Sequence, residues 1–122
     1  MIDHVGLKVK DFKKSLGFYA KALGPLGYKV LSEGEGYAGL GTTKSPDLWI
    51  STGEPPKPGV HLAFVGKKRA IVDRFHAEGV RAGGRDNGKP GIRKDYHPNY
   101  YAAFVFDPDD NNVEVVCHDP KG

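Results

Sequence analysis

The stretch that decides the fold is residues 111–118, which read NNVEVVCH. Val113, Val115 and Val116 mark a β-strand with a buried face, and the period-two alternation of a strand puts Glu114 on the face opposite Val113 and Val115. A carboxylate taken out of water is costly unless a cation, a metal or a set of donors stabilises it. The stretch therefore predicts a strand and a partner for Glu114.

The rest of the chain divides into two series of elements of the same kind. The first series is a strand at 2–9, a helix from Asp11 to about Leu23, and strands at 27–32, 36–41 and 47–52. The linker GEPPKPG is too rich in Pro and Gly for either element. The second series is a strand at 60–66, a helix at 67–79 ending at Gly79, a short strand at 80–84, a polar loop at 85–98, and strands at 99–107 and 113–118. Each series reads β-α-β-β-β.

The two series align as a repeat. An offset of 57 residues places His4 on His61 and Phe18 on Phe75, and an offset of 65 places Trp49 on Glu114. We expect a single domain, 1–122, with module one at about 1–54 and module two at about 58–119. The predicted fold class is α+β, with two βαβββ modules forming one curved mixed sheet and the helices outside.

Four side chains are expected to converge in the cup of this sheet: His4, Trp49, His61 and Glu114. A lone strand histidine is more often structural than a ligand, so the case depends on ligand-type residues at equivalent positions of the repeat. Two imidazoles and one carboxylate suit Fe, Mn, Ni, Co or Zn and leave coordination sites open. The sequence therefore predicts a divalent metal site made by His4, His61 and Glu114.

Aromatic residues and one loop histidine are the candidates for contacting a substrate. Trp49 and Tyr37 would line the cup, and His97 would reach it from the loop. Alternation gives Tyr100 and Tyr101 to opposite faces, and we favour Tyr101 as the donor or acid in the cup. Glu114 and Tyr101 are thus the candidate catalytic residues.

Composition and charge exclude several classes of protein. The 122 residues are 39% apolar and 27% charged, and the net charge of +3 is spread along the chain, which argues against a nucleic-acid partner. No stretch approaches the roughly 18 apolar residues of a membrane span. The single cysteine, Cys117, and the lack of a signal-like start favour the cytoplasm.

Three stretches carry a resemblance to a known family: IDHVGLKVKDFKKSLGFYAKALGPLGYKV, GVHLAFVG and YYAAFVFDPDDNNVEVVCH. With these, the chain resembles the vicinal oxygen chelate superfamily, which includes glyoxalase I, extradiol dioxygenases and the bleomycin and fosfomycin resistance proteins. The resemblance covers nearly the whole chain. It implies paired βαβββ modules, a divalent metal that binds adjacent oxygens of a substrate, and a homodimer.

Carried over residue by residue, the resemblance implies metal ligands at His4, His61 and Glu114. Glyoxalase I has a fourth ligand at the position of Trp49, which cannot ligate. The three ligands are similar to those of extradiol dioxygenases, yet Phe104 stands where those enzymes carry a tyrosine near the iron. Both departures point away from a standard member of either group.

Three functions follow as hypotheses. The first is a small metal-dependent enzyme that acts on a compound with adjacent oxygens, by isomerisation, lyase chemistry, epoxide or ring opening, or oxygenation. The second is a metal-free small-molecule binding or antibiotic-sequestering protein of the bleomycin-resistance type, although the charge of +3 is poorly suited to cationic bleomycin. The third is an interaction module without a small-molecule function.

Overall fold

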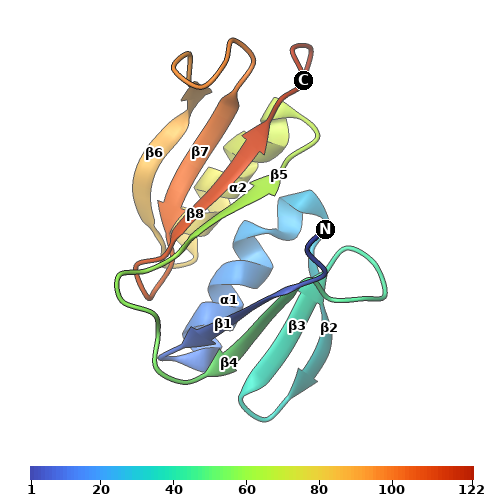
Figure 1. The fold of residues 1–122 in the computed structure, drawn as a ribbon, viewed down its shortest axis with the longest axis vertical. Helices are drawn as coiled ribbons and strands as arrows, with labels where there is room; N and C mark the ends of the chain where they lie inside the picture. Colours follow the sequence, from blue (N-terminus) through green and yellow to red (C-terminus); the bar gives the residue numbers. More distant parts are fainter.

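The computed structural model describes residues 1–122 and folds them into eight strands and two α-helices (Figure 1). A short 3₁₀ turn, Gly24–Leu26, follows the first helix. In chain order the elements are β1 (Val5–Val9), α1 (Phe12–Ala22), β2 (Lys29–Gly34), β3 (Tyr37–Gly41), β4 (Leu48–Thr52), β5 (His61–Val65), α2 (Arg69–Arg81), β6 (Arg85–Ile92), β7 (Tyr101–Phe106) and β8 (Asn112–Cys117).

The strands form two four-stranded sheets of identical order. The first sheet has the order β1-β4-β3-β2 and the second has the order β5-β8-β7-β6. The strand that comes first in each module is parallel to the one that comes last, so β1 pairs with β4 and β5 with β8. Gly6 lies opposite Trp49 in the first sheet, and Ala63 lies opposite Glu114 in the second. These registers confirm the repeat, with offsets of 57 for β1 and β5 and 65 for β4 and β8.

The α+β fold built from two βαβββ modules is confirmed, and the structure adds a detail. No strand pair joins the two sheets, so β1 and β5 are edge strands and the expected curved surface consists of two separate sheets. Figure 1 shows the sheets one above the other, with β1 and β5 nearest the boundary between the modules.

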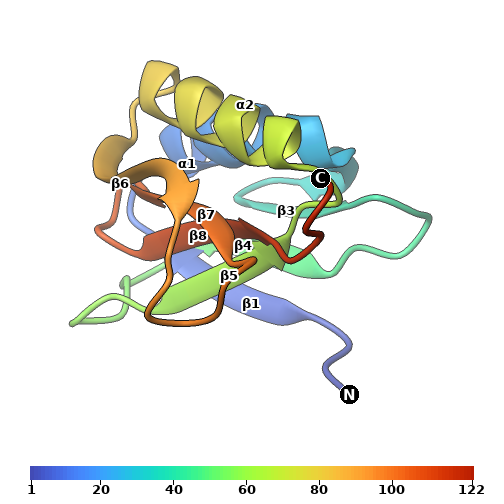
Figure 2. The same cartoon turned by 90° about the horizontal axis from the view of Figure 1, so that it is seen from above.

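Both helices lie on the same side of the strands (Figure 2). The carboxylate of Asp11 caps α1 by accepting from the backbone N of Lys14 at 3.2 Å. Phe18 of α1 and Phe75 of α2, which are equivalent in the repeat, are both fully buried. Neither helix has the length and apolar character needed to cross a membrane.

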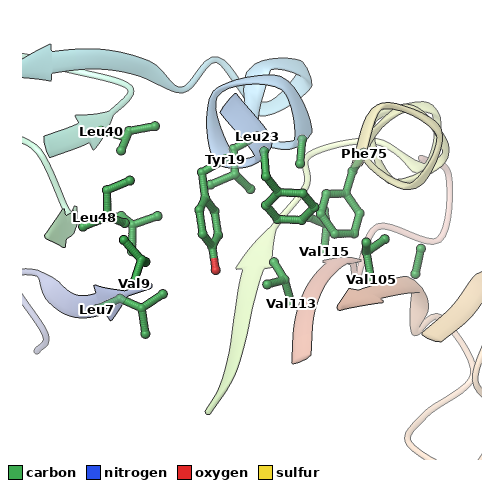
Figure 3. Packing of buried hydrophobic residues seen from close by; sticks show 14 of the residues in the cluster. Leu7, Val9, Tyr19, Leu23, Leu40, Leu48, Phe75, Val105, Val113 and Val115 are labelled. Carbon is green, nitrogen blue, oxygen red and sulfur yellow. The ribbon is translucent and has the colours of Figure 1, made fainter. Parts of the chain in front are cut away.

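One hydrophobic core of 17 buried residues serves both modules. Figure 3 shows Tyr19 and Leu23 of α1 between Leu48 of the first sheet and Val113 of the second, and Phe75 of α2 above Val105 and Val115 of the second sheet. The remaining face of each sheet carries no helix (Figure 2), and we call it the helix-free face.

Three expectations for residues 79–98 are wrong: the helix end at Gly79, the strand at 80–84 and the loop over all of 85–98. Gly79 does not end α2, because it lies inside the helix, beside Ala22 of α1. The segment 80–84 is not a strand: α2 continues to Arg81, and Gly83, with φ of +104°, turns the chain. The strand is β6, inside the expected loop, and its register shifts hide the alternation that identifies a strand.

A buried polar cluster connects the modules beside the turn after β7. The Tyr19 hydroxyl donates to Asp107 at 2.5 Å, and Asp107 also accepts from the backbone N and side-chain Nδ2 of Asn111. Asn111 in turn accepts from the backbone N of Val60, just before β5. Both oxygens of the buried Asp107 carboxylate therefore have hydrogen-bond donors. Through Asp107 and Asn111, the turn motif DPDDN links α1 of the first module to the start of β5 in the second.

Candidate functional site

Glu114 lies on the helix-free face of the second sheet and is nevertheless buried. Val113, Val115 and Cys117 of β8 belong to the core, so the alternation of the strand turns Glu114 the other way. Its side chain is only 2% exposed. Phe104 of β7 stands directly opposite it on the same face.

Two side chains stabilise the buried carboxylate. His61 Nε2, on β5, lies 2.8 Å from Glu114 Oε1, and the hydroxyl of Tyr100 donates to Oε2. Burial and the hydrogen bond to Glu114 raise the pKa of Tyr100 to about 12, so this phenol is a neutral donor near neutral pH. The partner that the sequence requires for Glu114 is therefore a histidine and a tyrosine.

The His61–Glu114 pair has the spacing of two metal ligands. Ligand atoms that lie about 2.1 Å from a divalent ion at right angles to one another are about 3 Å apart. His61 Nε2 and Glu114 Oε1 are 2.8 Å apart, and the His61 side chain is 53% exposed, which leaves its ring accessible from the open side. An imidazole and a carboxylate are suitable donors for Fe, Mn, Ni, Co or Zn, so these two residues fit such an ion.

The structure does not bring His4 to this pair within one chain. No group of three or more His, Cys, Asp or Glu side chains is arranged to hold a metal ion. His4 immediately precedes β1, where its Nδ1 lies 2.7 Å from Asp3 Oδ1 and its side chain is 54% exposed. It lines a groove of about 330 Å³ between the start of β1 and the second half of β5.

Trp49 and Tyr37 lie on the first sheet, apart from the pair. Leu48 and Ile50 of β4 belong to the core, so Trp49 points to the helix-free face. Its ring centroid is 6.4 Å from that of Tyr37, which is exposed. The two rings form an aromatic surface on the first sheet that is equivalent by the repeat to the position of Glu114 on the second.

The preference for Tyr101 over Tyr100 at the site is not supported by the geometry. Tyr101 pairs with Cys117 on the core side of the second sheet, and its hydroxyl donates to Asp73 of α2 at 2.5 Å. Arg69 of α2 also packs over its ring. Tyr100, just before β7, contacts Glu114 instead, because it has the parity of Phe104.

His97 contacts Tyr100, which in turn contacts Glu114. Its Nε2 is 2.8 Å from His118 Nδ1, and its ring centroid is 5.3 Å from that of Tyr100. The backbone N of Asn99 donates to His97 Nδ1, so Nε2 carries the proton that is donated to His118. The interaction of His97 with His118, a residue that the sequence gives no role, orients the loop that carries Tyr100.

Two residues of this face are not among the site residues predicted from the sequence: Tyr100, over which Tyr101 was favoured, and Arg93. Tyr100 could have been found by counting its parity from Phe104. Arg93 gives no sequence signal, because it follows an irregular strand whose bulges change the parity of every position. A cavity of about 820 Å³ lies elsewhere, between the proline-rich linker and the turn at 108–110, and has no hydrophobic lining residue.

The sequence model of the Glyoxalase/Bleomycin resistance protein/Dioxygenase superfamily matches residues 1–115. Because this match covers nearly the whole chain, the chain belongs to this superfamily. No functionally curated protein matches it.

Solved structures show the same fold over nearly the whole chain. A glyoxalase/bleomycin resistance protein from Albidiferax ferrireducens T118 is 26% identical, with 94% of this chain and 96% of that chain covered and a TM-score of 0.79. A glyoxalase/bleomycin resistance protein/dioxygenase family enzyme from Burkholderia phytofirmans PsJN is 18% identical, with coverages of 95% and 97% and a TM-score of 0.74. A domain of the same description from Frankia sp. EAN1pec is 20% identical, with coverages of 96% and 96% and a TM-score of 0.70.

Proposed function

We propose that the protein is an enzyme that requires a divalent metal ion and acts on a small molecule with two adjacent oxygens. The observation that carries the proposal is the His61 Nε2–Glu114 Oε1 pair, 2.8 Å apart on the helix-free face. His61 and Glu114 would hold the ion. When bound, it supplies Lewis-acid polarisation of a substrate oxygen. Tyr100 is a neutral proton donor fixed beside Glu114, and His97 orients it from the loop.

The metal is tested by elemental analysis of untagged protein purified without added metal. We expect a stoichiometric divalent ion in the natural protein and its loss in His61→Ala and Glu114→Gln, because each removes a donor. His76→Ala is the matched control, since His76 forms a similar pair with Asp86 at 2.8 Å outside the site. A protein that holds no divalent ion after incubation with Fe, Mn, Ni, Co and Zn in turn would contradict the proposal.

The third ligand in this proposal is His4 from a second copy of the chain. His4 is not grouped with His61 and Glu114 in one chain, yet it is the counterpart of His61 in the repeat. A homodimer that places the first sheet of one copy against the second sheet of the other would also cover the open side of the site with Trp49 and Tyr37.

Mixing two variants that each bind metal poorly distinguishes a site shared between two copies from a site within one chain. His4→Ala and Glu114→Gln should each bind metal poorly alone. Unfolded and refolded together, they form mixed dimers in which one of the sites has all its ligands, so metal binding should return in part. If the mixture binds no more metal than the separate variants, His4 does not act across a dimer.

A second candidate is a metal-free small-molecule binding protein. One observation favours it: both oxygens of Glu114 already have hydrogen-bond partners, so the carboxylate is stabilised without an ion. A thermal-shift screen of small molecules in EDTA separates the two functions, because a strong stabilisation that survives chelation would support binding without metal.

A further inference from the structure

Arg93 occupies the far end of a row of side chains that crosses the second sheet. The row contains one side chain from each strand or strand end: His61 on β5, Glu114 on β8, Phe104 on β7 and Arg93 just after β6. The His61 ring lies 6.4 Å from the Phe104 ring, and the Arg93 guanidinium lies 5.3 Å from the centre of that same ring. The proposed metal ligands and Arg93 therefore flank one aromatic ring on one face.

The backbone holds the guanidinium in place. Arg93 donates to the carbonyl oxygens of Lys89 at 2.7 Å and Gly91 at 2.9 Å. A Cβ at Gly88 would lie 3.1 Å from one terminal nitrogen of Arg93, and a Cβ at Gly91 would lie 3.2 Å from the other. The two glycines of β6 thus provide the space in which the side chain folds back over the strand.

This cation has no counterion in the protein. None of the ion pairs of the chain includes Arg93, whereas Arg81 and Arg85 each pair with a carboxylate. A guanidinium has five N–H donors, and the two carbonyls leave the others free. A partly buried, fixed and unpaired guanidinium is suited to bind a planar anion through two parallel hydrogen bonds.

We propose that Arg93 binds the carboxylate of the substrate, which is a small carboxylic acid. The inference rests on the proposed function at His61 and Glu114, whose substrate class it defines. Since neighbouring strands are about 4.8 Å apart, Arg93 lies two strand spacings, roughly 10 Å, from Glu114. The acid group would lie at Arg93, an apolar middle would pass the edge of the Phe104 ring, whose face Arg93 covers, and the adjacent oxygens would reach His61 and Glu114.

The experiment measures binding of benzoate to protein kept in EDTA, by two-dimensional NMR titration. Benzoate should shift the resonances around Arg93 and Phe104, and neutral benzamide of the same shape should bind at least about ten-fold more weakly. Arg93→Gln should weaken benzoate binding by about ten-fold or more, and Arg93→Lys should fall between, since it keeps the charge but not the planar fork.

Arg85→Gln is the matched control, because Arg85 packs on Phe106 of the same sheet at 4.9 Å but is paired with Asp110. It should leave benzoate binding unchanged. Equal affinity for benzoate and benzamide, equal affinity for benzoate and inorganic phosphate, or an unchanged affinity in both Arg93 variants would overturn the assignment. Benzamide and Arg93→Lys keep the test valid if Arg93→Gln does not fold.

Chelation separates this result from that of the proposed function. Benzoate binding in EDTA depends on Arg93 and not on a metal ion, whereas metal content depends on His61 and Glu114. A protein that binds metal but not benzoate refutes the role of Arg93 alone, and one that binds benzoate but no metal refutes the metal-dependent function alone.

Discussion

At the scale of single residues, tyrosines are hydrogen-bond partners of four carboxylates of this protein. Four tyrosine hydroxyls donate to an aspartate or glutamate: Tyr19 to Asp107, Tyr28 to Asp47, Tyr100 to Glu114 and Tyr101 to Asp73. A phenol next to a carboxylate resists ionisation, because the phenolate would be desolvated and repelled by the negative charge. The pKa of each of these four tyrosines is accordingly raised.

These raised pKa values predict a loss of stability at alkaline pH. Unfolded tyrosines release their protons near pH 10, whereas folded Tyr100 keeps its proton to about pH 12. Between these values the native state binds more protons than the unfolded state, so the free energy of unfolding falls as pH rises. Below about pH 9 these tyrosines keep their protons in both states, so they do not change the free energy of unfolding with pH.

Urea unfolding of the metal-free protein at about pH 8, 10 and 11 measures this slope. Tyr101→Phe, outside the proposed site, should make the decline shallower, because one of the shifted groups is gone. A free energy of unfolding that stays constant from about pH 9 to pH 11 would contradict the prediction.

At the scale of elements, two glycines near the end of α2 have different roles. A Cβ at Gly79 would lie 3.5 Å from Ala22 of α1 and from Val105 of β7, which is ordinary contact. A Cβ at Gly84, after the helix, would lie 2.5 Å from Phe18 and 2.6 Å from Val105, which is too close. Only Gly84 is required by the packing.

We therefore predict opposite effects for the same substitution at these two sites. Gly79→Ala should stabilise the protein by about 1 kcal/mol, because alanine costs less backbone entropy in a helix. Gly84→Ala should destabilise it by about 1–3 kcal/mol, because the core must shift to accept the methyl group. Urea denaturation measures both, and equal effects of the two changes would show that the contact between α1 and α2 differs from this description.

At the scale of the whole molecule, the modules repeat each other but do not stand alone. Their sheets share no strand pair, and what joins them is the common core beneath α1 and α2 and the buried Tyr19–Asp107 hydrogen bond. A module without its partner would expose the inner side of its helix and sheet to water.

The shared core predicts that the chain unfolds in one cooperative transition and that residues 1–54 do not fold when produced alone. The far-ultraviolet circular dichroism of this fragment should lack the helical signal of α1, while the full chain unfolds with coincident transitions in fluorescence and circular dichroism. A folded fragment, or two separate transitions in the full chain, would mean that each module has an independent core.

The sequence itself determined the repeat, the βαβββ order and the face of the strand on which Glu114 lies. Each of these depends on the alternation and spacing of residues close together in the chain, and not on which strands pair. Only the tertiary structure decided that His61 meets Glu114, that Asp73 of α2 accepts from Tyr101, and that Arg93 lies over Phe104. Those contacts depend on strand order, on the bulges of β6 and on the packing of one module against the other. Each of these is set by residues far apart in the chain, which no local pattern records.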